Sequence, residues 1–285
     1  MSSLEHDTGT PKARSRRRRW LVRALRALAG TILVWLLLAY VILPALWRHY
    51  EHQPSLADAP KTTFTSLGIP GDPLNVGLIG TEDMVLRSML DSGWTPADPT
   101  TLRSSLRITR SVLFGRPDPA APVSNLYVFR RKQDLAFEKA SGKNARRRHH
   151  VRFWESADLG REGAPLWIGA VTFDKSVGFS HRTGQITHHI DADVDAERDG
   201  LIQDLTRAGR LTTTYQVTGL GATLAGRNGG GDLYFTDGEM TLAVLTTGGP
   251  AVGKPEELLN PPAVRLKDDL FSRIRPVLQA TESSR

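Results

Sequence analysis

The longest uninterrupted apolar segment of the chain runs from residue 27 to residue 47 and reads ALAGTILVWLLLAYVILPALW, without a charged side chain. A helix of about 20 apolar residues crosses the hydrocarbon core of a bilayer, which is about 30 Å thick. Trp20 and Trp47 flank the segment, as is typical of the two membrane interfaces. A cleaved signal peptide usually has a shorter apolar stretch and small residues at its cleavage site, whereas this segment ends in Leu46-Trp47-Arg48. The pattern therefore predicts one transmembrane helix.

Shorter apolar segments follow, and they predict a single folded domain from residue 74 to residue 280. Residues 48–73 are polar and contain four prolines, so we expect a juxtamembrane linker there. The run LNVGLIG at residues 74–80 is typical of a buried strand. Thr81 then suits the N-cap of a helix, with acidic residues in its first turn and Gly93 after its end.

Alternating apolar and polar positions dominate the remainder of the domain and predict strands. The expected strands cover residues 123–131, 149–154, 166–173, 185–190, 211–218, 233–235 and 240–246, the last two joined as a hairpin across residues 236–238. Further helices are expected over residues 100–114, 195–208 and 264–274. Asp195 is expected to cap the second of these helices and Pro276 to end the third. The fold class is therefore α+β: one N-terminal transmembrane helix followed by a single mixed α/β domain with a predominantly antiparallel sheet.

The basic charge of the chain is concentrated before the apolar segment. The formal net charge is +7, and residues 1–26 carry eight basic and two acidic side chains. The remaining residues are close to neutral, which argues against a nucleic-acid partner. Basic residues mark the cytoplasmic side of a membrane span, so we expect a cytoplasmic arm over residues 1–26 and a domain outside the cytoplasmic (inner) membrane. The lipid bilayer is the expected partner, and a membrane protein is a second candidate partner.

Two histidine doublets, in RRHHVRFW and in ITHHID, hold half of the eight histidines, and both fall on expected strands. Neighbouring side chains of a strand point to opposite faces, so each doublet splits into one histidine among apolar neighbours and one among polar neighbours. On the polar faces lie His150 and Arg152 of one strand, and His189 and Asp191 of the other. If the two strands share a sheet, these faces meet. The four residues are the candidate catalytic set, in which a histidine beside Asp191 exchanges a proton and Arg152 binds an anion.

A divalent metal ion is the candidate cofactor. The chain contains no cysteine, so nitrogen and oxygen donors would have to form such a site. The candidate ligands are His150, His189, Asp191 and Asp193. The D-x-D-x-D sequence from Asp191 does not continue as a calcium-binding EF-hand loop, because Ala196 and Ile202 replace the required glycine and glutamate. The alternative is that the histidines are hydrogen-bonded structural residues and that the acids cap the next helix.

A glycine-rich segment, GRNGGGD at residues 226–232, is a further candidate site. Consecutive glycines can present backbone N–H groups to an anion. The same composition is typical of a mobile hairpin loop, so both interpretations remain open at this point.

Eight motifs of the chain are long enough to compare with known families. They are PLNVGLIG from Pro73, SGW from Ser92, PVSNLYVF from Pro122, QDLAFEK from Gln133, RRHHVRFW from Arg147, LWIGAVTFD from Leu166, GQITHHIDADVDAERD from Gly184 and GRNGGGD from Gly226. Together, over residues 70–245, they resemble the LssY C-terminal-like domain family. The resemblance implies a bacterial, envelope-associated domain, sometimes fused to multi-spanning modules that resemble type-2 phosphatidic-acid phosphatases or DedA-like proteins. It supplies no catalytic residue.

The signature of those lipid phosphatases is itself incomplete in this chain. Arg182 and His188 reproduce its Arg-x5-His spacing, but His181 stands in place of the serine and Ala192 in place of the aspartate. We therefore expect a membrane-anchored binding or accessory module in lipid or envelope metabolism. The alternative is an enzyme that acts on an anionic lipid or phosphoester through the candidate catalytic residues.

Overall fold

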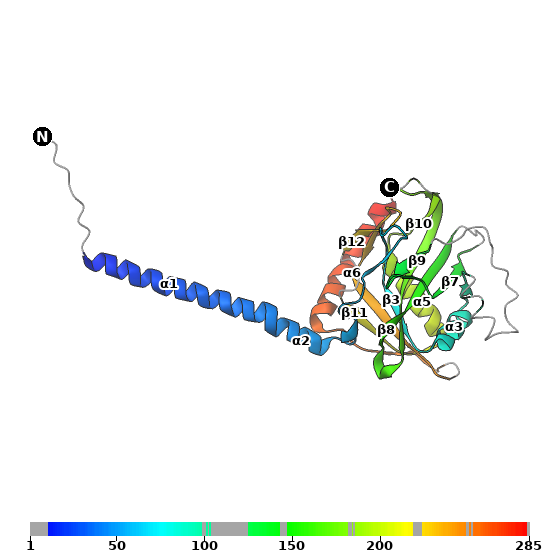
Figure 1. The fold of residues 1–285 in the computed structure, drawn as a ribbon, viewed down its shortest axis with the longest axis horizontal. Helices are drawn as coiled ribbons and strands as arrows, with labels where there is room; N and C mark the ends of the chain where they lie inside the picture. The colour runs from blue at the N-terminus through cyan, green and yellow to red at the C-terminus, as the bar shows by residue number, and fades with distance from the viewer. Residues whose placement is uncertain are drawn as a thin grey trace. The chain divides into compact units, whose positions relative to one another are not determined.

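The chain forms two compact units, Met1–Glu51 and His52–Arg285. They are seen in a computed structural model that describes residues 11–98, 101, 103, 125–142, 147–181, 184, 186–218, 224–248, 251 and 253–283. The first unit is helical, and the second is a mixed α/β domain, as the sequence predicts (Figure 1).

The first unit contains one long helix made of three consecutive segments: α1 (Pro11–Leu37), η1 (Leu38–Ile42) and α2 (Leu43–Tyr50). Its apolar part, Arg18–Leu46, contains an 18-residue stretch with a mean hydropathy of 2.3, and protein atoms bury none of that stretch. The η1 segment is a π-helical turn, and Pro44 follows it. Proline lacks the N–H that the helical ladder uses, and its ring crowds the carbonyl four residues earlier, so a wider turn accommodates it. The length and composition fit a single-pass membrane anchor.

A nine-stranded sheet forms the centre of the second unit (Figure 1). The strands lie in the spatial order β15, β11, β14, β3, β9, β8, β7 and β4, and β10 also pairs with β9. Their bounds are β3 Val76–Ile79, β4 Thr95–Pro96, β7 Leu135–Ala140, β8 Arg148–Leu159, β9 Pro165–Phe179, β10 Ile186–Ile190, β11 Leu211–Thr218, β14 Glu239–Leu245 and β15 Glu256–Glu257. The β3–β14 and β11–β15 pairs are parallel, and the other pairs of this sheet are antiparallel. The expected predominantly antiparallel sheet is confirmed.

Two smaller sheets include a segment that we expected to be a linker. One sheet has the order β2 (Pro70–Pro73), β1 (Thr62–Phe64), β5 (Tyr127–Val128) and β6 (Arg131–Lys132), and the other pairs β12 (Leu224–Arg227) with β13 (Leu233–Thr236). Strand β2 begins and ends with proline, which an edge strand tolerates because its outward N–H positions need no partner strand. The compact unit therefore begins at His52, earlier than the expected start at residue 74.

Apolar side chains pack on both faces of the large sheet. On one face, α3 (Glu82–Asp91) and α5 (Val194–Arg207) cover the sheet with a core that includes Val85, Met89, Phe137, Phe153 and Leu201. On the other face, the short helical turn η2 (Pro54–Leu56) contributes to a core that includes Leu56, Leu74, Trp154, Tyr215 and Leu242. A second short turn, η3 (Arg161–Gly163), connects β8 to β9. The C-terminal helix α6 (Pro262–Ser283) buries Phe271 against Ala192 and Phe235.

Helix ends test the local predictions. The α3 cap is confirmed, because the Thr81 hydroxyl accepts a hydrogen bond from the N–H of Met84 at 3.3 Å. The α5 cap is wrong by two residues, because Asp193 rather than Asp195 caps this helix. The expected stop at Pro276 is also wrong, since this proline lies inside α6 at an exposed position, where water can hydrate the carbonyl that loses its partner.

The hairpin expected across residues 236–238 is wrong as well. Strand β13 pairs with β12, whereas β14 pairs with β11 and β3. The strand expected over residues 123–131 is shorter, because within its described part only β5 and the first residue of β6 are strand. The helix expected over residues 100–114 lies outside the described residues except at Thr101 and Arg103.

Candidate functional site

A row of buried ionisable side chains follows one face of strand β8. Because a strand alternates its side chains, Arg148, His150 and Arg152 share this face, while Val151 and Phe153 point to the other face and pack under the helices. All three are buried. On the adjacent strand β9, Thr172 lies opposite His150 and Asp174 lies opposite Arg148. The pairing register therefore places a second polar row beside the first.

The buried carboxylate of Asp174 connects the two rows to strand β10. One oxygen of Asp174 lies 3.4 Å from Nε of Arg148 and 3.5 Å from Nδ1 of His188. Arg148 also donates a hydrogen bond to Glu138 of β7 at 2.8 Å. Opposite charges thus alternate across the three neighbouring strands β7, β8 and β9, which offsets part of the cost of removing them from water.

Four ionisable residues, Asp72, Arg152, Asp174 and His188, line one pocket of about 330 Å³, which we call the Arg152 pocket. The Arg152 guanidinium lies 3.5 Å from the Asp72 carboxylate, which comes from strand β2. Three further segments contribute to the wall: residues 65–71, 125–127 and 228–230. Small-molecule sites typically have volumes of about 300–1,000 Å³, so the Arg152 pocket fits a compact ligand.

The glycine-rich segment between β12 and β13 forms one wall of the Arg152 pocket. A side chain at Gly229 would place its Cβ 2.9 Å from Cγ2 of Thr65 and 3.3 Å from the carbonyl oxygen of Pro70, so this close approach requires glycine. The carbonyl of Gly230 accepts hydrogen bonds from the hydroxyl of Ser180 and from the N–H of His181. The segment is therefore packed against the loop between β1 and β2 and bonded to the end of β9.

Two groups in the Arg152 pocket have pKa values shifted in opposite directions. Burial raises the pKa of Asp72, and the neighbouring Arg152 cation opposes this shift only in part. Burial lowers the pKa of His188, against the opposing negative charge of Asp174. The pocket therefore combines a carboxyl group that holds its proton more strongly than usual with an imidazole that is neutral at pH 7. Such a divergence is typical of acid and base groups that act together.

The comparison with known families agrees with these motifs and with the fold. The family model described as LssY C-terminus matches residues 56–240, which is more than half of the chain. The chain belongs to this family. No curated protein and no solved structure was found to match it. The LssY C-terminal match contains every residue that lines the Arg152 pocket, and the family together with the apolar N-terminal helix fits a membrane-anchored protein.

Beneath the Arg152 pocket, the LssY C-terminal domain buries His150 between two arginines of the same strand. Its Nε2 atom has no hydrogen-bond partner among the described residues. Burial lowers the pKa of His150 well below its usual value, and the positive charges of Arg152 and Arg148 lower it further. His150 is therefore neutral in the folded domain at pH 7, and it does not line the pocket.

The lowered pKa of His150 predicts a loss of stability in acid. In the unfolded chain this histidine titrates near pH 6.5, whereas the folded domain resists its protonation. Its contribution to stability is therefore complete above about pH 6.5 and is lost as the pH falls below that value, with a slope of up to about 1.4 kcal/mol per pH unit. Chemical unfolding of the wild type and of His150→Gln between pH 7.5 and 5 should show a shallower decline for the variant. Parallel declines would contradict the assignment of a neutral, buried histidine.

The polar residues that lie together on this face differ from the expected candidate catalytic set. His150 and Arg152 share a face as predicted, but His188, rather than His189, joins them. The register pairs Ile190 with Asp174, so His188, two residues before Ile190, lies on that face. The pairing is irregular between His189 and Ile190, and such bulges change which side chain points to a given face. His189 accordingly contacts Asp232, with 2.7 Å between Nδ1 and Oδ1.

The two aspartates of the candidate sets belong to the start of helix α5. Asp191 accepts a hydrogen bond from the N–H of Asp193 at 3.1 Å, and Asp193 caps the helix by accepting from Ala196. Asp193 also pairs with Arg275 of α6 through two hydrogen bonds of 2.8 Å. Among the described residues, the expected ligands His150, His189, Asp191 and Asp193 therefore do not gather as one group of donors, and Asp193 connects α5 to α6.

Sequence reasoning missed three residues of the Arg152 pocket: Asp72, Asp174 and His188. A signal for Asp174 exists, because Thr172 and Asp174 are alternate polar positions in an otherwise apolar strand. His188 has apolar neighbours at alternate positions, so its pattern indicates a core face. Asp72 lies in PGDP, whose prolines indicate a linker more strongly than a strand.

Proposed function

We propose that the LssY C-terminal domain of this chain binds a small polar ligand in the Arg152 pocket, outside the cytoplasmic membrane of a bacterium. The observation that carries the proposal is that four ionisable side chains line the same Arg152 pocket: Asp72, Arg152, Asp174 and His188. Burying ionisable groups costs stability unless they are well paired. Nδ1 of His188, 3.5 Å from the Asp174 carboxylate, has no hydrogen-bond partner among the described residues, so this nitrogen can bind a ligand.

The residues that line the Arg152 pocket indicate which class of ligand it binds. A guanidinium group binds phosphate or carboxylate oxygens, and the glycine-rich wall brings backbone dipoles close to the same space. Carboxylates such as Asp174 accept hydrogen bonds from hydroxyl or ammonium groups. A compact headgroup that carries both an anionic group and hydrogen-bond donors, as in polar lipids and envelope precursors, satisfies both requirements. A domain anchored by the apolar helix would meet such headgroups at the membrane surface.

The acid/base character of the pocket supports a second candidate function. With a raised pKa at Asp72 and a lowered pKa at His188, one group can donate a proton while the other accepts one. In hydrolysis of a phosphoester in a bound headgroup, a water molecule would attack phosphorus while His188 takes a proton from that water. Asp72 would give its proton to the leaving oxygen, and Arg152 would stabilise the developing negative charge. In this case the pocket converts its ligand rather than only holding it.

Titration of the full-length chain in detergent tests the binding proposal. We expect saturable binding of phosphoethanolamine or glycerol 3-phosphate by isothermal titration calorimetry, and none of uncharged glycerol. Replacing Thr187, which lines the pocket, by tryptophan should weaken binding at least tenfold by filling the hollow. Replacing the exposed Thr212 of β11 by tryptophan is the matched control and should leave binding unchanged.

The titration also distinguishes the two candidate functions. Release of inorganic phosphate from either compound, lost in the Thr187→Trp variant, would favour the enzyme. Absence of binding to every compound, or equal affinities of the two tryptophan variants, would contradict a ligand site in the Arg152 pocket.

A further inference from the structure

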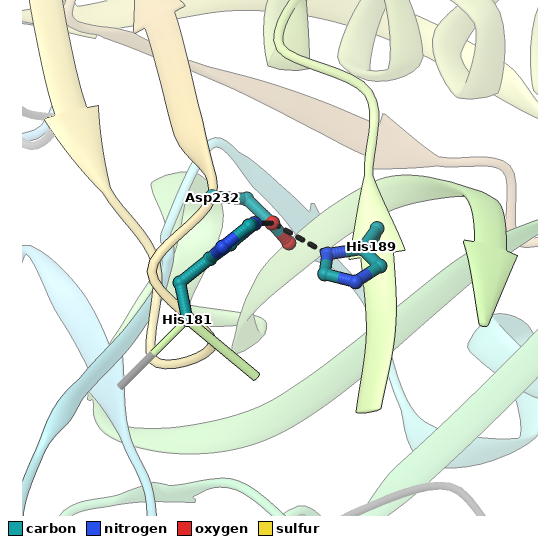
Figure 2. A group of neighbouring side chains, drawn as sticks. All are labelled: His181, His189 and Asp232. Carbon is teal, nitrogen blue, oxygen red and sulfur yellow. Dashed lines mark hydrogen bonds and ion pairs between the residues drawn. The ribbon is translucent and has the colours of Figure 1, made fainter. Parts of the chain in front are cut away.

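We propose that His181, His189 and Asp232 form a site for one divalent transition-metal ion, separate from the Arg152 pocket. Figure 2 shows the two imidazole rings and the carboxylate converging from three segments of the chain. His181 follows the end of β9, His189 lies on β10, and Asp232 ends the glycine-rich segment before β13. One donor atom from each residue lies within 4.8 Å of the others.

The distances between these donor atoms fit a small metal ion. Nδ1 of His189 lies 2.7 Å from Oδ1 of Asp232, and Nε2 of His181 lies 3.7 Å from the same oxygen. Zinc binds histidine nitrogen and carboxylate oxygen at about 2.0–2.2 Å, which places two tetrahedral ligands about 3.3 Å apart. The two observed separations lie on either side of this value. The third separation, between the two histidine nitrogens, is at most 4.8 Å, so small movements of the side chains would bring the three donors around one ion.

Hydrogen bonds to its Oδ2 atom hold the Asp232 carboxylate in place. Its Oδ2 atom accepts a hydrogen bond from the N–H of Ile190 at 3.2 Å and one from the Asn228 amide at 3.3 Å. The backbone N–H of Asp232 in turn donates to the side-chain oxygen of Asn228 at 2.9 Å. These bonds occupy one carboxylate oxygen and direct the other toward the two histidines. Outer hydrogen bonds of this kind orient ligands in metal sites.

Gly178 of β9, which lies against the imidazole of His189, sets the position of this ring. A Cβ atom built on Gly178 would lie 2.7 Å from Nε2 of His189, so any larger residue would displace the imidazole. With Nε2 against the backbone of β9, Nδ1 is the nitrogen that faces Asp232. The ring therefore presents a defined donor atom to the site rather than rotating freely.

The types of donor indicate the class of metal. Two imidazoles and one carboxylate suit zinc and other first-row transition metals, whereas calcium and magnesium prefer sites made of oxygen alone. The His181 side chain is 66% exposed, so the site opens to solvent. Three protein ligands and an open side leave room for a water molecule or a ligand as a fourth donor. The ion would also cross-link three parts of the domain: the end of β9 through His181, β10 through His189 and the glycine-rich segment through Asp232.

Metal titration of the full-length chain in detergent, after treatment with a chelator, tests the site. We expect one zinc ion per chain by elemental analysis after gel filtration. We also expect a visible absorption band when cobalt(II) replaces zinc. His181→Ala should lower the affinity at least tenfold without changing the melting temperature of the metal-free protein, because this side chain is exposed and can be removed without leaving a cavity. His52→Ala, at a histidine whose ring nitrogen contacts the carbonyl of Leu259, is the control and should keep the metal.

A second variant, His181→Cys, tests the site through a new absorption band rather than through a loss of binding. His181→Cys should retain zinc, because thiolate is a strong ligand, and should add a cobalt–thiolate charge-transfer band in the near ultraviolet. Equal affinities of the wild type and His181→Ala, or the absence of stoichiometric zinc in the wild type, would overturn the proposal. In that case His189 and Asp232 form a hydrogen bond without a metal. The binding function of the Arg152 pocket does not depend on either result.

Discussion

Replacing Arg198 by leucine is expected to lower the free energy of unfolding of the domain by about 3–5 kcal/mol. Arg198 of helix α5 is 3% exposed, and its guanidinium forms two hydrogen bonds of 2.9 and 3.0 Å with the carboxylate of Asp237. It also lies 3.3 Å from the fully buried Asp195. Without the arginine, two carboxylates would be left in a poorly solvated environment with no cation between them.

The network around Arg198 explains the size of this effect. Asp195 accepts hydrogen bonds of 2.7 Å from the hydroxyl of Thr236 and from the N–H of Asp237, and Arg198 donates to the carbonyl of Glu239 at 3.0 Å. These contacts join α5 to the turn between β13 and β14. The same turn that was expected to close a hairpin therefore binds a helix instead.

Urea unfolding at two pH values measures the expected loss. Burial raises the pKa of Asp195 to about 6 even with Arg198 beside it, so removing the arginine must raise that pKa further. A folded-state pKa above the unfolded value means that stability is lost as the pH rises through it, so the deficit of Arg198→Leu should be larger at pH 8 than at pH 5.

The matched control is Arg207→Leu, on the same helix. Arg207 is 72% exposed and pairs with Asp204 at the surface, where such pairs contribute about 0–1 kcal/mol. A loss below about 1 kcal/mol for both variants would contradict the view that the buried Arg198 network holds α5 to the sheet.

Placing two arginines in the apolar helix, as Leu33→Arg with Leu36→Arg, is expected to abolish stable membrane insertion. Both leucines lie near the middle of the apolar part, Arg18–Leu46. Each arginine near the centre of a span adds about 2.5–3.5 kcal/mol to the free energy of insertion, so the pair adds about 5–7 kcal/mol. Sodium carbonate extraction of membranes should leave the wild type in the pellet and release the variant.

The alanine pair Leu33→Ala with Leu36→Ala controls for loss of side-chain volume and should stay in the pellet. Equal extraction of the arginine and alanine variants would show that the helix does not need an apolar environment. Release of the wild type itself would contradict membrane anchoring altogether.

Features that depend on neighbouring residues in the sequence could be predicted in this protein. The cap at Thr81 needs only its hydroxyl and the first turn of α3, and it is found as expected. Strand β11 covers the expected residues 211–218, because a period of two is visible in one segment alone. The apolar helix was predicted from its length and lack of charge.

Features that depend on which strands pair could not be predicted in the same way. Both histidine doublets lie on strands as expected, but β9 lies between them, and the irregular register before Ile190 brings His188 to the Arg152 face. A shift of one residue exchanges the two faces of a strand, and no local pattern fixes such a shift. The contact between His189 and Asp232 joins residues that are 43 positions apart.

Protease digestion of cells is the most direct test of the central proposal, that a single helix holds the LssY C-terminal domain outside the cytoplasmic membrane. The full-length chain, with an epitope tag at its C-terminus, would be produced in a bacterial host and converted to spheroplasts with an intact inner membrane. We expect added protease to remove the tag and the domain while a cytoplasmic marker protein survives. A tag that survives until detergent opens the membrane would contradict the claim.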